Sequence, residues 1–122
     1  MPSADDEISS FIRSSFRSVW SLELLLLLRR EPRLWSHDEL VVTLRASDLV
    51  VSQGLEMLCV AGLVTVDEQG RGLYSPTPGA TSLVDGAASL YARSPDAVRR
   101  LIVDRKVSGL AAFADAFRLR KE

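Results

Sequence analysis

The side chains that most often carry out catalysis are scarce in this sequence. It contains one histidine, His37, and one cysteine, Cys59, whereas a metal site needs a cluster of such ligands. The sequence has no Ser/His/Asp set, no glycine-rich phosphate loop and no pair of carboxylates at catalytic spacing. His37 fits a solvated surface histidine, and Cys59 fits a small packing residue. We therefore predict a protein that is not an enzyme and that has no metal site and no cofactor.

Charge is distributed unevenly along the chain, and this bears on what the protein could bind. Residues 36–75 contain two basic residues, Arg45 and Arg71, against six acidic ones, which is a net charge of −4. Residues 93–122 contain eight basic residues against four acidic ones, a net charge of +4. Because neutralising phosphates supplies most non-specific DNA affinity, the first segment is poorly charged for DNA. The whole chain carries −1, which indicates no overall bias toward nucleic acid or anionic membranes.

A short helix that Ser3 can cap is predicted through Ile8, Phe11 and Ile12. Three more helices, numbered first to third here, are predicted after it in the first half of the chain. A nearly all-apolar helix begins near Ser18 and ends before Pro32, and we expect it to be the central buried helix. Ser36 and Glu39 have the spacing of a capping box at the start of the second helix. Ser47 can cap the third helix. One face of that third helix is predicted to be buried by its spacing of i, i+4, i+7 and i+11: Val51, Leu55, Leu58 and Gly62.

A β-hairpin and further helices are predicted to follow. The β-branched run over residues 63–66 and the short run over 73–75 indicate two strands around a glycine-containing loop. Thr77-Pro78 and Ser94-Pro95 each have the pattern of a cap followed by proline in the first helical turn. The last predicted helix places three apolar residues on one face: Leu110, Phe113 and Phe117.

The third helix and the strand after it carry a resemblance to a known family. The residues concerned are Val51-Ser52, Leu55, Leu58 and Gly62-Leu63-Val64. This stretch resembles the third helix and first wing strand of bacterial winged-helix transcriptional regulators of the MarR and PadR kind, and the match covers about residues 18–75. The resemblance implies a mainly α fold with a small β-hairpin wing, a winged helix-turn-helix with additional C-terminal helices over 76–122. It also implies a homodimer that binds duplex DNA through the third helix and the wing.

Carried over by position, the resemblance also assigns the binding residues. Gln53 could pair with adenine, and Arg71 is the only basic residue of the predicted wing. The third helix has no lysine or arginine, Glu56 would face a polyanion, and Leu49 lies where a polar residue is usual. An apolar outer face of this kind binds protein, so a winged-helix protein-interaction module that does not bind DNA is the alternative function. The residues assigned to DNA or partner binding are Ser47, Leu49, Ser52, Gln53, Glu56, Gln69 and Arg71.

Size and composition set the expected organisation. A chain of 122 residues fits one domain with its own core, in which Trp20 and Trp35 are predicted to be buried. The acidic N-terminal residues are unlike a signal peptide and one cysteine fits a reducing compartment, so we expect a cytoplasmic protein without a membrane span. The apolar stripes of the C-terminal helices need cover, and we expect a second copy to supply it. The residues predicted at this dimer contact are Leu101, Ile102, Leu110, Phe113 and Phe117.

Overall fold

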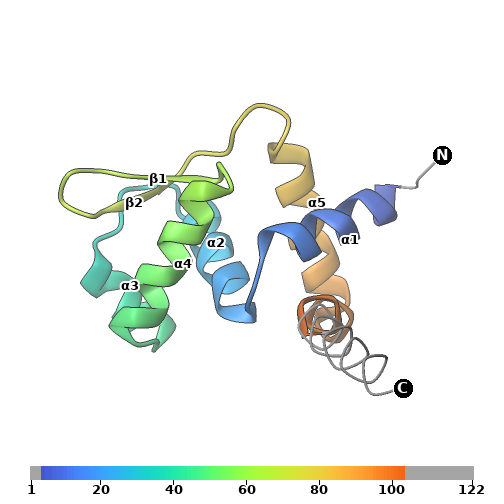
Figure 1. The fold of residues 1–122 in the computed structure, drawn as a ribbon, viewed down its shortest axis with the longest axis horizontal. Helices are drawn as coiled ribbons and strands as arrows, with labels where there is room; N and C mark the ends of the chain where they lie inside the picture. Colours follow the sequence, from blue (N-terminus) through green and yellow to red (C-terminus); the bar gives the residue numbers. More distant parts are fainter. Residues whose placement is uncertain (1–3, 104–122) are drawn as a thin grey trace, which may run out of the picture.

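Six helices and one small antiparallel sheet make up residues 4–103, the part of the chain that the computed structural model describes. The predicted last helix, with Leu110, Phe113 and Phe117, lies outside these residues. In chain order the elements are α1 (Ala4–Ser15), α2 (Val19–Arg30), α3 (His37–Leu44), α4 (Asp48–Val60), β1 (Val64–Val66), β2 (Gly72–Tyr74) and α5 (Thr81–Arg93), followed by a helical segment over residues 95–103 (Figure 1).

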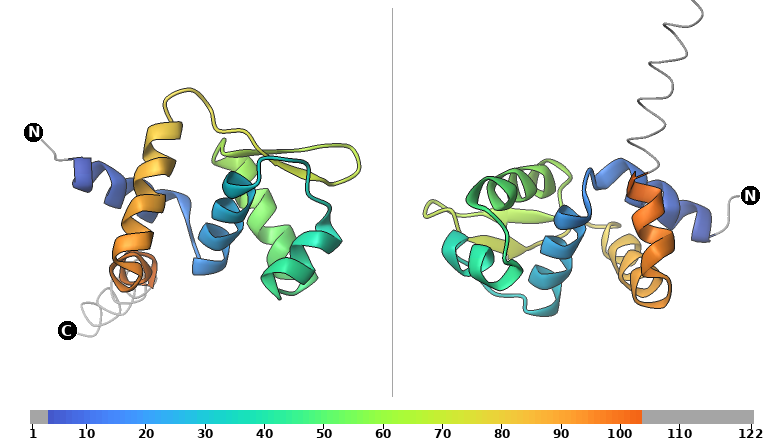
Figure 2. Two further views of the ribbon diagram at one scale, coloured as in Figure 1. Left: turned by 180° about the vertical axis from the view of Figure 1, so that it is seen from behind. Right: turned by 90° about the horizontal axis from the view of Figure 1, so that it is seen from below.

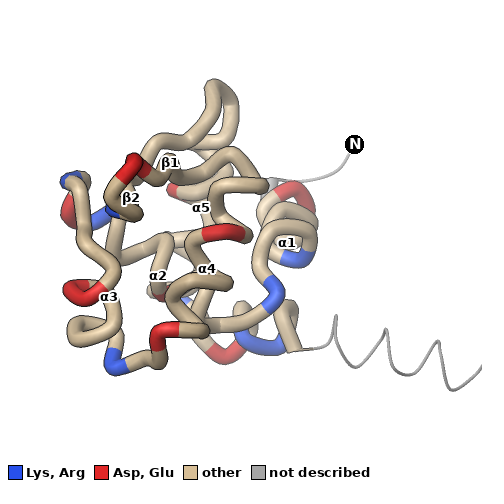
Figure 3. The backbone as a smooth tube through the Cα atoms, turned by 60° about the vertical axis from the view of Figure 1, so that its left-hand side comes forward, with Lys and Arg blue, Asp and Glu red and all other residues tan. Residues whose placement is uncertain are grey.

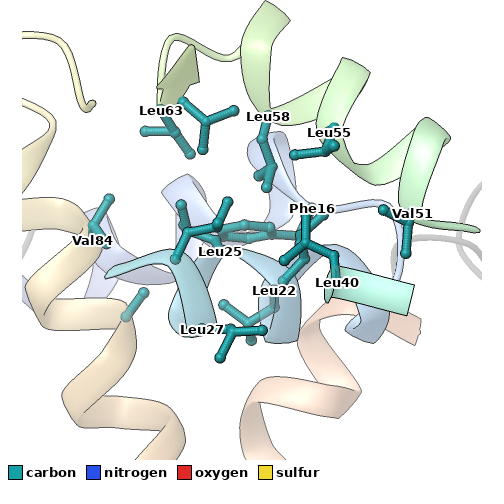
Figure 4. Close-up of a cluster of buried hydrophobic side chains, with 14 of the residues drawn as sticks. Phe16, Leu22, Leu25, Leu27, Leu40, Val51, Leu55, Leu58, Leu63 and Val84 are labelled. Atoms are coloured by element: carbon teal, nitrogen blue, oxygen red, sulfur yellow. The ribbon is translucent and has the colours of Figure 1, made fainter. Parts of the chain in front are cut away.

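Helix α2 lies between two groups of elements. On one side α1 packs against α5, and on the other side α3, α4 and the hairpin pack together (Figures 1 and 2). Five leucines of α2 are buried, so the all-apolar composition of this helix correctly predicted its central place. Figure 4 shows side chains from α2, α3, α4 and α5 in this core. The α4 side chains in it are Val51, Leu55 and Leu58, which confirms the predicted buried face of that helix.

Serine caps define where α2, α3 and α4 begin, and the caps of α3 and α4 are the predicted ones. The Ser18 hydroxyl accepts the amide of Ser21, and the Ser47 hydroxyl accepts the amide of Val50 at 3.1 Å. The capping box of α3 is complete, because the Ser36 hydroxyl accepts the amide of the third helical residue and that residue's carboxylate accepts the Ser36 amide at 2.9 Å. Each cap satisfies a backbone donor that the first helical turn leaves without a partner, which contributes about 1 kcal/mol.

The start of α5 differs from the sequence prediction. Thr77-Pro78 was expected to open this helix, but residues 78–80 form a turn and the helix begins at Thr81. The physical reason is Gly79, whose φ of 90° lies in a region that a right-handed helix does not allow. The amide of Thr77 instead donates to the carbonyl of Gly62 at 2.9 Å, which ties this segment to the end of α4. The Ser94-Pro95 prediction is confirmed, since residues 95–103 are helical.

The sheet is a two-stranded hairpin that is extended by one isolated bridge. Val64 pairs with Tyr74 and Val66 with Gly72 in antiparallel register. Trp35 bridges to Gly72 through two backbone hydrogen bonds of 2.8 and 2.9 Å. Trp35 is 3% exposed, as predicted, but Trp20 is 45% exposed. The core prediction for Trp20 is therefore wrong, because this ring lies in the first turn of α2 and borders two surface grooves that leave part of it uncovered.

Candidate functional site

The outward face of α4 carries the third-helix residues that the sequence assigned to binding. Its buried stripe turns one side of the helix toward α2, so residues at the same spacing on the opposite side point away from the core. Leu49 is 64% exposed and Val60 is 85% exposed, so two large apolar side chains lie uncovered on the same side of this helix. Gln53 and Glu56 lie between them on this face and are also exposed. We call these four residues the α4 stripe.

The other four assigned residues lie outside this stripe. Ser52 is exposed on α4. The hydroxyl of Ser47 already accepts the amide of Val50, so its first role is to cap the helix. Gln69 and Arg71 lie in the loop between β1 and β2, where the Arg71 guanidinium donates to the Gln69 side-chain oxygen at 3.1 Å.

A groove of about 710 Å³ borders the α4 stripe. The connection between α1 and α2 and the first turn of α2 supply the opposite wall with Arg17 and Trp20. Met57 and Val60 contribute apolar surface from α4. Close packing of α4 on α2 forms the floor, since a Cβ on Gly54 would lie only 2.9 Å from a methyl group of α2. The sequence did not point to this groove, because the leucine run after Trp20 made a buried ring the simplest interpretation.

Arg71, the expected phosphate contact of the loop, is held by an acidic neighbour. Its Nε donates to Asp67 Oδ2 at 2.7 Å, and its amide donates to Asp67 Oδ1 at 2.8 Å. The hydrogen bond from the Arg71 backbone, together with the side-chain hydrogen bond and charge of Arg71, holds the pKa of Asp67 below its usual range. Phosphate binding by Arg71 must therefore compete with an existing, geometrically favourable ion pair.

Basic side chains are absent from α4 itself, as the colours in Figure 3 make visible. His37 Nε2 lies 3.0 Å from Asp48 Oδ1, so the side chain at the first turn of α4 interacts with α3. Arg45 ends α3 in a left-handed backbone conformation with φ of 55°. Neither Glu56 nor Arg17 has a hydrogen bond or ion pair with any other described residue. Among residues 4–103, the site is thus an apolar stripe with one acid, Glu56, and a neighbouring groove wall with one base, Arg17, and neither side chain has a partner there.

A second groove, of about 630 Å³, lies between α2, α3 and α5. The Tyr91 hydroxyl of α5 donates to Glu23 Oε1 of α2 across it at 2.5 Å. Burial, with a further contribution from this carboxylate, raises the pKa of Tyr91. Glu23 is half-buried, which agrees with its position at the edge of the central helix. This hydrogen bond joins α5 to α2, so holding the two helices together accounts for the polar pair of Tyr91 and Glu23 in the groove.

The residues assigned to a dimer contact are only partly placed. Ile102 is 2% exposed and packs in the core of its own chain, so its assignment to a free dimer face is corrected. Its neighbour Leu101 is half-buried against the same core. Leu110, Phe113 and Phe117 lie outside the described residues.

Metal ligands, the cysteine thiol, the helix lengths and the comparisons with known proteins assign no further function to the described residues. Within residues 4–103, no group of three or more potential metal ligands comes together. Burial raises the pKa of the Cys59 thiol, which disfavours a reactive thiolate. None of the helices that the structure describes has the length and apolar character needed to cross a membrane. No family model, no curated protein and no solved structure matches this chain.

Proposed function

We propose that this protein is a winged-helix module whose third helix, α4, binds another protein surface through its outward face. The observation that carries this proposal is the exposure of Leu49 and Val60 on one side of a helix that has no basic residue. A partner that covers these side chains removes apolar surface from water, which is the main favourable term in protein association. The order of α3, α4 and a hairpin supports the winged-helix assignment.

Electrostatics supports protein over DNA as the partner of this face. Duplex DNA presents a dense row of phosphates, and binding it requires lysine and arginine side chains. Glu56 lies at the centre of the α4 stripe, and Arg71 in the loop is paired with Asp67. A phosphate row against this face would meet an acid and two apolar side chains.

Site-specific photo-crosslinking in cells of the source organism tests the proposal. The photoreactive residue is introduced as Gln53→p-benzoylphenylalanine on the stripe, and as Ser89→p-benzoylphenylalanine on the exposed side of α5 for comparison. We expect a protein crosslink from position 53 that Val60→Asp removes. The matched control is Val42→Asp, which puts the same charge on a side chain that is 75% exposed on α3 and outside the groove. Equal crosslinking from both positions, or crosslinking that is indifferent to Val60→Asp, would contradict the proposal.

The second candidate function is a dimeric transcriptional regulator that binds duplex DNA. The observation that favours it is the short connection between α3 and α4 followed by the hairpin, an arrangement that places a helix in the major groove in DNA-binding proteins. The salt dependence of binding to duplex DNA separates the two functions. Because Arg71 is paired with Asp67, we expect the plot of log affinity against log salt concentration to have a slope shallower than roughly −2. Arg71→Ala should change this slope by less than about 0.9. A steeper slope that Arg71→Ala reduces by a full unit would favour this second function.

A further inference from the structure

We infer that the partner of the α4 face is a second copy of the same chain, arranged so that each α4 stripe lies in the groove of the other copy. This inference rests on the proposed function, because it names the occupant of the same face. The supporting feature is that the stripe and the groove lie side by side and share Gln53, Glu56 and Val60. A surface that carries a projecting stripe next to a matching groove can pair with itself about a two-fold axis.

The charges on this face are complementary under that two-fold axis. Glu56 comes from α4, and Arg17 comes from the opposite wall of the groove. They do not pair within one chain, and neither has another partner in the described part. When the stripe of one copy enters the groove of the other, Glu56 of each copy faces the Arg17 wall of its partner. The interface then contains two equivalent ion pairs, and neither copy's Glu56 is covered without a counter-charge.

The apolar surface is arranged in the same way. Val60 and Leu49 project from the stripe, while Trp20 and Met57 line the groove or its edge. From Val50 to Val60 the groove follows α4 for about 15 Å, or three turns, at 1.5 Å per residue. In the proposed dimer an equal length of α4 from a second copy lies along this groove in antiparallel orientation. The exposure of Trp20 and of the stripe is then explained by one contact that covers both.

A charge-swap experiment on the full-length chain tests the inference. The wild type, Glu56→Arg and Arg17→Glu are compared by sedimentation equilibrium, with circular dichroism to verify that all three are folded. We expect a wild-type dimer and a loss of affinity of roughly a hundredfold or more for each single variant, because each places like charges together twice per dimer. Mixing the two variants should restore a dimer of nearly wild-type affinity, since Glu56→Arg of one copy meets Arg17→Glu of the other at one contact, and the second contact keeps the wild-type pair of Glu56 and Arg17. A merely structural effect of either substitution cannot produce this rescue.

Two further measurements locate the contact. Val60→Asp should dissociate the dimer, whereas the matched Val42→Asp should not. Trp20 fluorescence should shift to shorter wavelength as the protein concentration rises, because its partly exposed ring becomes covered, while the buried Trp35 stays unchanged.

Several results would overturn the inference. A wild type that stays monomeric up to roughly 1 mM excludes the dimer, while a crosslink from Gln53 to another protein would leave the proposed function standing. A dimer that ignores the Glu56 and Arg17 substitutions places the contact elsewhere on the chain. Loss of the dimer in both single variants without rescue on mixing contradicts the Arg17–Glu56 pairing.

Discussion

Gly54 controls how closely α4 approaches α2, and Gly54→Ala measures this approach. The added Cβ would lie 2.9 Å from Leu24 Cδ2, closer than van der Waals contact allows. Leu24 is 1% exposed, so its methyl group has little room to move. Alanine in a helix is favoured over glycine by about 1 kcal/mol, whereas an extra methyl group in a packed core costs about 1–3 kcal/mol. We therefore expect Gly54→Ala to lower the free energy of unfolding by roughly 0–2 kcal/mol instead of raising it by about 1 kcal/mol.

A double-mutant cycle measured by urea unfolding separates these two effects. Leu24→Ala alone should cost about 2–5 kcal/mol, as deletion of a buried leucine does. Combined with Gly54→Ala, the new methyl group occupies part of the cavity, so the double variant should be more stable than the sum predicts by about 1–2 kcal/mol. Ser52→Ala, on the exposed side of the same helix, shows the effect of helix propensity alone. If Gly54→Ala stabilises the protein and its effect adds to that of Leu24→Ala, α4 does not pack as closely on α2 as described here.

Three other substitutions, with Gln53→Ala as a control, test the core, the link between helices and the hairpin loop. Leu58→Ala should cost about 2–5 kcal/mol in urea unfolding because Leu58 is fully buried, whereas Gln53→Ala should stay within about 0.5 kcal/mol. Tyr91→Phe removes the donor to Glu23 and should cost about 1 kcal/mol at neutral pH. Because the pKa of Tyr91 is raised in the folded state, this contribution is present below roughly pH 10 and is lost as pH rises through the raised value. The pKa of Asp67 is lowered, so its contribution is present above roughly pH 4 and is lost as pH falls through the lowered value; Asp67→Asn should remove this part of the acid dependence of unfolding.

Helix boundaries were largely predictable because they depend on local chemistry. A serine hydroxyl that accepts an amide two or three residues away needs nothing from the rest of the chain, and Ser36 and Ser47 do so as predicted. The buried stripe of α4 was predictable because helical periodicity alone determines which side chains share a face. The start of α5 was not, because Thr77 forms its backbone hydrogen bond with the distant Gly62 and Gly79 adopts a positive φ.

The candidate site was less predictable because it depends on contacts between distant segments. Composition identified Arg71 as the basic residue of the hairpin loop, but the folded loop brings its guanidinium and amide onto Asp67. Trp20 has the character of a core residue, yet it borders a groove whose other wall comes from α4. The ion pair of Arg71 and the exposure of Trp20 follow from the tertiary arrangement. The number of charged or apolar residues along the sequence does not predict them.

The two faces of α4 have different roles. Val51, Leu55 and Leu58 hold the helix against α2 and define where it lies, and any set of well-packed apolar residues at this spacing would do the same. The outward residues do not contribute to that packing, so the fold leaves their chemistry free. A protein with this arrangement can therefore present a basic, DNA-binding helix or an apolar, protein-binding one. In this chain the outward residues between the apolar ends are Gln53 and Glu56, and the acid, more than the order of the helices, favours a protein surface as the partner.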